Sequence, residues 1–124
     1  MSSRPAALIV EDQPFIGLVA SDILQESGYQ TYHAYGADDA AALLSAHPEI
    51  EVVVTDSELH GPVDGLQLAH RVSKARPDVQ LVVTTAGRDL SSSAMPDGAR
   101  ALRKPYASGE LRTVVAAKSL LTDA

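Results

Sequence analysis

Five polar side chains at four separate places in the chain have the types that metal binding and phosphoryl chemistry require. They are three carboxylates, a hydroxyl and an ammonium: Glu11, Asp12, Asp56, Thr85 and Lys104. Three carboxylates brought together repel one another unless a cation or a proton compensates them. Mg²⁺ suits a site that supplies a few carboxylates and leaves positions for water and phosphate. A Mg²⁺ and the lysine would together balance the three negative charges.

The acidic residues have separate predicted roles. Asp56 is the predicted nucleophile, which would take a phosphoryl group and form an acyl phosphate. Asp12 is the predicted direct metal ligand, and Glu11 would help directly or through a water molecule. Glu58 lies two residues beyond Asp56, where the loop can turn the Glu58 backbone carbonyl toward the metal. The predicted metal site therefore consists of Glu11, Asp12, Asp56 and that carbonyl.

The hydroxyl and the ammonium would act on the phosphoryl group itself. Thr85, or alternatively Thr84, would donate its hydroxyl to a phosphoryl oxygen, and the small Ala86 would leave room for that group. Lys104 would pair with the phosphoryl charge as a compact point cation. In-line phosphoryl transfer needs little beyond such positioning and charge neutralisation.

Each of these residues also has an ordinary structural explanation. Glu11 and Asp12 could cap a helix, Thr85 could simply end a strand, and Lys104 could be a solvated lysine before a turn. The functional interpretation therefore depends on whether the fold brings all of them to one edge.

Hydrophobic patterns predict five short strands separated by helices. Short apolar runs bounded by turn residues are typical of strands that are covered on both faces. These runs are residues 6–10, 50–55 and 79–84, and residues 29–34 and 99–103 are predicted as a second and a short fifth strand. Apolar spacing and helix-ending residues predict the helices: residues 14–27, a helix capped by Asp38 or Asp39, residues 64–76, at most two turns within residues 88–98, and a final helix containing Leu111, Val114, Val115, Lys118 and Leu121.

This alternation predicts an α/β fold, a doubly wound five-stranded parallel sheet with helices on both faces. The fourth helix is predicted to be short or irregular, because the serines at 91–93 and Pro-Asp-Gly at 96–98 favour turns. In such folds the loops that leave the carboxyl ends of the strands share one rim. Since Asp56, Thr85 and Lys104 end or follow the third, fourth and fifth strands, we expect them to meet the acidic pair there.

The bulk properties narrow the classes of function. We expect one domain over residues 1–124 with no output domain, since this length suits a single core. No apolar stretch approaches the roughly 18 residues that span a bilayer and no signal peptide is recognisable, so we expect a cytoplasmic protein without a membrane segment. The absence of cysteine excludes disulfides and thiolate sites. A formal net charge of -6 opposes direct binding to nucleic acid.

The order and spacing of these motifs resemble a response-regulator receiver domain of two-component signalling, of the standalone single-domain type, over nearly the whole chain. The resemblance is carried by Glu11-Asp12, Asp56, Thr85-Ala86 and Lys104-Pro105. It implies a (βα)5 flavodoxin-like fold with strand order 2-1-3-4-5. It also implies that Asp56 takes a phosphoryl group from the phosphohistidine of a histidine kinase or a histidine phosphotransfer protein, with Mg²⁺ as cofactor.

The same resemblance implies that the chain is not an enzyme beyond slow self-catalysed phosphoryl transfer and autodephosphorylation. We expect it to act on an unknown downstream protein by noncovalent contact, as a relay intermediate, or as a sink for phosphoryl groups. We expect a monomer or a weak dimer.

Two features depart from the family pattern. The loop after the acceptor, residues 59–65, is one residue longer than usual, and we expect its His60 to be solvated rather than catalytic. Ala101 occupies the position at which many receiver domains carry an aromatic switch. Tyr106 could replace that aromatic residue, although a packed tyrosine is the stronger expectation.

Three other functions compete with the receiver interpretation. Phosphatases of the haloacid-dehalogenase type use a similar set of residues but place the nucleophile after the first strand, where this chain has its acidic pair. A flavodoxin-like nucleotide or flavin binder needs a phosphate-cradling loop at that same place, where Glu11 and Asp12 would repel phosphate. A phosphorylation-independent adaptor would not require Asp56, Thr85 and Lys104.

Overall fold

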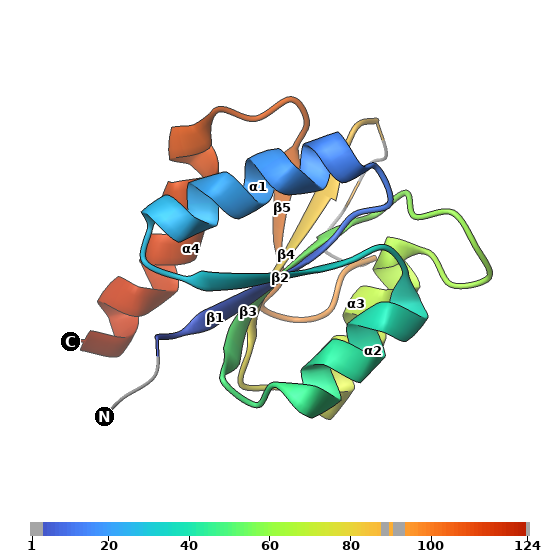
Figure 1. Ribbon diagram of the computed structural model, residues 1–124, viewed down its shortest axis with the longest axis horizontal. Helices are drawn as coiled ribbons and strands as arrows, with labels where there is room; N and C mark the ends of the chain where they lie inside the picture. Colours follow the sequence, from blue (N-terminus) through green and yellow to red (C-terminus); the bar gives the residue numbers. More distant parts are fainter. Residues whose placement is uncertain (1–3, 88–89, 91–93, 124) are drawn as a thin grey trace.

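A parallel sheet of five strands lies at the centre of the structure, with helices on both of its faces (Figure 1). The computed structural model describes residues 4–87, 90 and 94–123. The strands are β1 (Ala6–Val10), β2 (Gln30–Ala34), β3 (Ile50–Asp56), β4 (Gln80–Thr85) and β5 (Arg100–Arg103). They lie in the order β2-β1-β3-β4-β5 and pair in parallel, which confirms the predicted sheet and strand order.

The described residues contain four helices, two on each face of the sheet. They are α1 (Pro14–Glu26), α2 (Ala37–Ala46), α3 (Gly65–Ala75) and α4 (Ser108–Asp123). In Figure 1, α1 and α4 cover one face and α2 and α3 cover the other. The helix α1 begins at Pro14 and ends before Gly28, whose φ of 100° favours glycine, as the sequence predicts.

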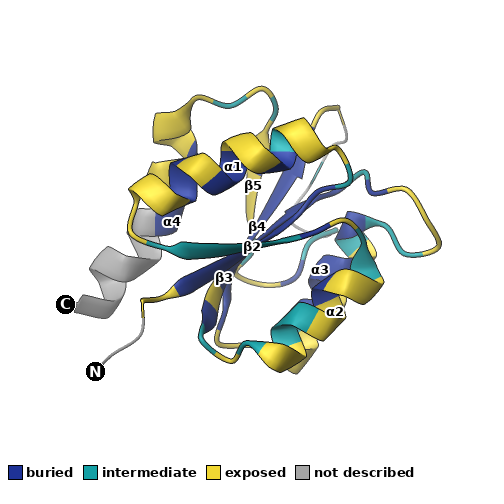
Figure 2. Ribbon diagram, viewed as in Figure 1, coloured by how far each residue is buried: buried dark blue, intermediate teal, exposed yellow. Residues whose placement is uncertain are grey.

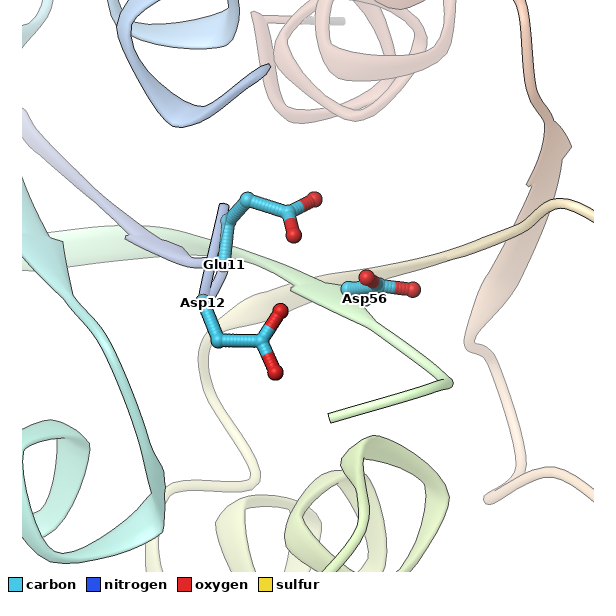
Figure 3. Close-up of side chains that lie close together, drawn as sticks. All are labelled: Glu11, Asp12 and Asp56. Atoms are coloured by element: carbon cyan, nitrogen blue, oxygen red, sulfur yellow. The ribbon is translucent and has the colours of Figure 1, made fainter. Parts of the chain in front are cut away.

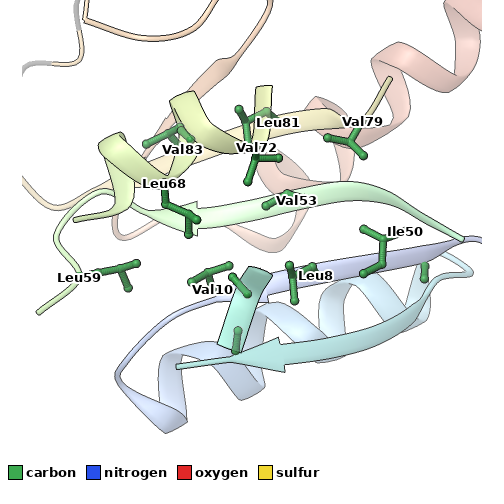
Figure 4. Packing of buried hydrophobic residues seen from close by; sticks show 14 residues of the cluster. Leu8, Val10, Ile50, Val53, Leu59, Leu68, Val72, Val79, Leu81 and Val83 are labelled. Atoms are coloured by element: carbon green, nitrogen blue, oxygen red, sulfur yellow. The ribbon is translucent and has the colours of Figure 1, made fainter. Parts of the chain in front are cut away.

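Alternating side chains of the central strands supply two apolar layers. Leu8 and Val53 face α2 and α3 and pack with Leu68 (Figure 4), whereas Ile9 faces α1 and α4 and shares a cluster with Leu111. β1, β3 and β4 are almost wholly buried, while β5 is largely exposed at the sheet edge (Figure 2). Strands covered on both faces read as continuous apolar runs, which explains why the sequence reveals them.

The register of the strands aligns their carboxyl ends. Val10 pairs with Thr55, and Asp56 pairs with Thr84. Glu11, the residue after Val10, is therefore level with Asp56. The carboxyl ends of β1, β3 and β4 therefore lie side by side and form the predicted rim.

One helix prediction needs correction, and another is tested only in part. The predicted cap of α2 at Asp38 or Asp39 is wrong, because Gly36 is the N-cap and both aspartates lie in the first turn. Carboxylates in a first turn are favoured by the helix dipole, so Asp38 and Asp39 suit the first turn of a helix as well as its N-cap.

The predicted fourth helix at 88–98 lies partly outside the described residues, at 88, 89 and 91–93. In the described residues 94–98 the chain forms turns rather than a helix, and Gly98 has a φ of 82°. The Pro-Asp-Gly sequence explains these turns.

Within the described part of the chain, no helix combines the length and the apolar character needed to cross a bilayer.

The first residue of α3 sets how closely that helix approaches the end of β3. Asp64 caps α3 through a reciprocal pair of hydrogen bonds with Gln67, and the Gly65 N–H donates to the Ser57 carbonyl at 3.2 Å. A Cβ on Gly65 would overlap the backbone carbonyl oxygen of Asp56. Glycine is therefore required here for packing.

We predict that Gly65→Ala lowers the free energy of unfolding by about 1–3 kcal/mol, because the backbone of β3 must move to admit the new methyl group. Urea unfolding monitored by circular dichroism would measure the loss. Gly109→Ala is the matched control, since a Cβ there meets open space and alanine stabilises a helix by about 0.5–1 kcal/mol. Equal stability of Gly65→Ala and wild type would contradict the packing argument.

Candidate functional site

The predicted site residues lie at the carboxyl ends of four strands. Glu11 and Asp12 follow β1, Asp56 ends β3, Thr85 ends β4 and Lys104 follows β5. Figure 3 shows the side chains of Glu11, Asp12 and Asp56 converging from the ends of β1 and β3. The structure therefore brings together carboxylates that are more than 40 residues apart in sequence.

The three carboxylates form a compact set of oxygen donors. One oxygen from each lies within 4.8 Å of the others. Glu11 and Asp56 are each only 3% exposed. Asp12 Oδ1 is buried and has no hydrogen-bond partner among the described residues. Three carboxylates with one unsatisfied buried oxygen fit a hard divalent cation such as Mg²⁺, because such ions take oxygen ligands and neutralise this charge.

Lys104 compensates two of these carboxylates. Its Nζ lies 2.8 Å from Glu11 Oε1 and 3.1 Å from Asp56 Oδ2. The Lys104 backbone N–H also donates to the Thr85 carbonyl at 2.7 Å, which ties the end of β5 to β4. The ammonium is therefore held over the predicted acceptor by both its side chain and its backbone.

Burial and charge act in opposite directions on this group. Burial lowers the pKa of Lys104, but hydrogen bonds to Glu11 and Asp56 outweigh it, so the pKa is raised above the ordinary 10.5. Burial raises the pKa of Glu11, and the charge of Asp56 adds to this effect, so the contact with Lys104 does not restore an ordinary value. The site consequently holds more negative charge than its lysine compensates.

Thr85 reaches the rim but hydrogen-bonds a residue with no predicted side-chain role. The Thr85 hydroxyl donates to Glu58 Oε1 at 2.8 Å. The Ala86 backbone N–H donates to both carboxylate oxygens of Glu58, at 3.2 and 3.3 Å. Burial raises the pKa of Glu58, but these hydrogen bonds outweigh it and lower the pKa overall. The Glu58 side chain is therefore held as a carboxylate.

The backbone of Glu58 also contacts the predicted acceptor. Its N–H donates to Asp56 Oδ1 at 3.0 Å. The two oxygens of Asp56 thus face different partners, a backbone amide and the Lys104 ammonium. The metal contact of the Glu58 carbonyl stays a prediction.

His60 contacts the predicted metal ligand. Its backbone N–H donates to Asp12 Oδ2 at 2.9 Å, and its ring Nδ1 lies 2.6 Å from the same oxygen. The side chain is 87% exposed, as expected of a loop histidine, but the contact with Asp12 was not predicted. The hydrogen bond and charge of Asp12 raise the pKa of His60. Although burial alone would raise the pKa of Asp12, the hydrogen bonds from His60 lower it.

His33 supports the acidic pair from β2, a role that the sequence did not reveal. Its Nε2 lies 2.9 Å from the Glu11 backbone carbonyl, where a ring N–H would donate to that oxygen. The His33 ring fills the space that a Cβ on Gly17 of α1 would occupy. A glycine inside a helix signals a close approach, and Gly17 was the available sequence signal.

Ala101, at the usual switch position, and Tyr106, its possible replacement, differ in burial. Ala101 is exposed on β5. Tyr106 is partly buried against the cluster beneath α1 and α4, which confirms the expectation of a packed tyrosine. Burial raises the pKa of Tyr106.

We predict that Lys104→Met costs about 3–5 kcal/mol of unfolding free energy at pH 7 without metal, because it leaves two buried carboxylates without their cation. The loss should shrink toward pH 5 as Glu11, whose pKa is already raised, takes a proton. Urea unfolding at both pH values would measure it.

The matched control is Lys74→Met at an exposed lysine of α3, which should change stability by at most about 0.5 kcal/mol. In the wild type, the raised pKa of Lys104 means that its stabilising contribution is complete below pH 10.5 and disappears only as the pH rises through the folded-state pKa. A Lys104→Met variant as stable as Lys74→Met would show that the lysine does not compensate the carboxylates.

Comparisons with known proteins agree with this architecture. The family model of the response regulator receiver domain matches residues 7–116. A crystal structure of a response regulator receiver protein from Sinorhizobium medicae superimposes with a TM-score of 0.84 at 26% identity, covering 97% of this chain and 95% of that one. The receiver domain of NtrX from Brucella abortus gives a TM-score of 0.81 at 29% identity, covering 94% and 98% of the two chains.

Two curated proteins are also similar in sequence. The nitrogen assimilation regulatory protein NtrX of Azorhizobium caulinodans is 30% identical over 87 residues, which are 69% of this chain and only 19% of that protein. Sporulation initiation phosphotransferase F of Bacillus subtilis is 25% identical over 111 residues, which are 87% of this chain and 88% of that protein.

Proposed function

The chain belongs to the response regulator receiver domain family, the phosphoacceptor signalling domains of two-component systems, and we propose that Asp56 is its phosphoacceptor. The observation that supports this most strongly is the position of Lys104, 3.1 Å from Asp56 Oδ2 at the rim shared with Glu11 and Asp12. A buried carboxylate beside both a cation and further carboxylates suits phosphoryl transfer better than a structural turn.

In the proposed reaction, a carboxylate oxygen of Asp56 attacks the phosphorus of a phosphohistidine. The new oxygen–phosphorus bond forms as the phosphorus–nitrogen bond breaks, and the electron pair of that bond returns to the imidazole nitrogen. Lys104 stabilises the charge on the phosphoryl oxygens, and the Thr85 hydroxyl donates to one of them. Glu11, Asp12, Asp56 and the Glu58 carbonyl would hold Mg²⁺, which when bound supplies the remaining positive charge.

The proposed partners follow from the family. Receiver domains receive phosphoryl groups from histidine kinases or histidine phosphotransfer proteins, and we propose the same for this chain. The similarity to a sporulation initiation phosphotransferase supports a role as a relay intermediate. The alternative roles are a sink for phosphoryl groups and a direct effector of a downstream protein.

We also propose that the chain is a cytoplasmic single domain, that it is a monomer or a weak dimer, and that its acyl phosphate is hydrolysed slowly by the chain itself. The chain spans only 19% of the length of NtrX from Azorhizobium caulinodans.

We predict that acetyl phosphate adds one phosphoryl group to the wild type only when Mg²⁺ is present, and that Asp56→Asn abolishes the adduct because an amide cannot form the acyl phosphate. Mass spectrometry of the intact chain would detect the phosphoryl adduct. Asp22→Asn, at an exposed carboxylate of α1, is the matched control and should be phosphorylated like wild type. A Mg²⁺-dependent adduct that persists in Asp56→Asn would overturn the assignment.

A further inference from the structure

The Glu58 carboxylate lies where the predicted phosphoryl oxygens would bind. Thr85 and the backbone amide that follows it are the hydrogen-bond donors at the end of β4, and both donate to Glu58 in this structure. A phosphoryl group on Asp56 requires donors of this kind for its oxygens. The Thr85 hydroxyl and the Ala86 N–H would therefore serve two anions. One is the Glu58 carboxylate, which they bind in this structure, and the other is the phosphoryl group.

We propose that Glu58 acts as an internal stand-in for the phosphoryl group, and that phosphorylation of Asp56 requires the Glu58 carboxylate to leave Thr85 and Ala86. This inference rests on the proposed function of Asp56. A carboxylate and a phosphoryl group cannot both accept from the Thr85 hydroxyl, because a hydroxyl has one proton to donate and two anions this close repel each other. In the unphosphorylated chain, a side chain of the loop thus occupies the donors that the phosphoryl group would use.

The contacts of the neighbouring residues make the displacement local. Leu59 is 6% exposed and packs in the core with Leu68, so the loop backbone at that point is anchored. Ala86 is exposed and has a small side chain, which leaves space beside the Glu58 carboxylate. Rotation of the Glu58 side chain toward solvent therefore needs no unfolding of the loop.

The loop backbone keeps its contacts with the site during such a rotation. The Glu58 N–H donates to Asp56 and the His60 N–H donates to Asp12, and both hydrogen bonds use the backbone rather than the Glu58 side chain. The loop turns at Gly61, whose φ of 118° favours glycine. The carboxylate of Glu58 is therefore the part of this loop whose position phosphorylation would change, and its movement to the surface would report the state of Asp56.

The proposal predicts that removing the negative charge of Glu58 eases phosphorylation. Glu58→Gln keeps the shape and an acceptor for Thr85 but removes the charge, and Glu58→Ala removes the competing group altogether. In both variants we expect the initial rate of the Mg²⁺-dependent adduct from acetyl phosphate to rise about tenfold, the factor that corresponds to one charge-assisted hydrogen bond. Beryllofluoride, a phosphoryl mimic, should bind both variants more tightly by a similar factor.

Two controls separate this effect from a general change in charge or folding. Glu51→Gln removes an exposed carboxylate at the opposite end of β3 and should behave like wild type. Thermal unfolding should show that Glu58→Gln is folded, and the amide NMR signal of Ala86 should move in the unphosphorylated variant because its carboxylate acceptor is gone.

The outcomes distinguish the two proposals. Faster phosphorylation and tighter beryllofluoride binding in both Glu58 variants, with Glu51→Gln unchanged, support the stand-in. Rates equal to wild type, or slower, overturn it while leaving Asp56 as the acceptor. An Ala86 amide signal that is unchanged in Glu58→Ala also overturns it. If wild type and all variants fail to form an adduct or to bind beryllofluoride, the assignment of Asp56 is wrong as well.

Discussion

Buried negative charge at the carboxyl ends of β1 and β3 is the constraint on which the rest of this structure depends. Glu11 and Asp56 are almost inaccessible to solvent and both contact Lys104. Burying carboxylates is costly unless hydrogen bonds and opposite charge compensate it, so the surrounding elements must supply donors. The short β5, at the exposed edge of the sheet, has the lysine at its end, and its backbone bond to Thr85 fixes where that lysine lies.

The single Lys104 ammonium compensates the negative charge of the buried carboxylates only in part. The raised pKa of Glu11 reflects burial and the nearby charge of Asp56 that one ammonium does not offset. A site of this kind favours the arrival of further positive charge, which is the property that a Mg²⁺-dependent acceptor needs. The loop after β3 meets the same electrostatic requirement by donating two backbone N–H groups, one to Asp56 and one to Asp12. It also places the Glu58 carboxylate on the hydroxyl and amide at the end of β4.

The sheet and the rim were predictable because they follow from short-range patterns. The buried strands β1, β3 and β4 read as apolar runs, and the polar residues at their carboxyl ends, such as Asp56, mark the rim. Side-chain direction in the loop was not predictable, because the chain between Asp56 and the cap at Asp64 has no period that fixes which way Glu58 or His60 points. The sequence therefore indicated Glu58 only as a backbone ligand, although its carboxylate makes the more extensive contacts. The cap of α2 was missed for a similar reason, since Asp38 and Asp39 suit both a cap and a first turn.

The carboxylate of Asp56 itself is the proposed site of the acyl phosphate. Reduction with borohydride converts an aspartyl phosphate to homoserine, so treating the phosphorylated wild type and mapping its peptides by mass spectrometry locates the modified residue directly. We predict homoserine at position 56, formed only when phosphoryl donor and Mg²⁺ were both present. Homoserine at position 12, or a phosphoryl group retained on a histidine with position 56 unmodified, would contradict it.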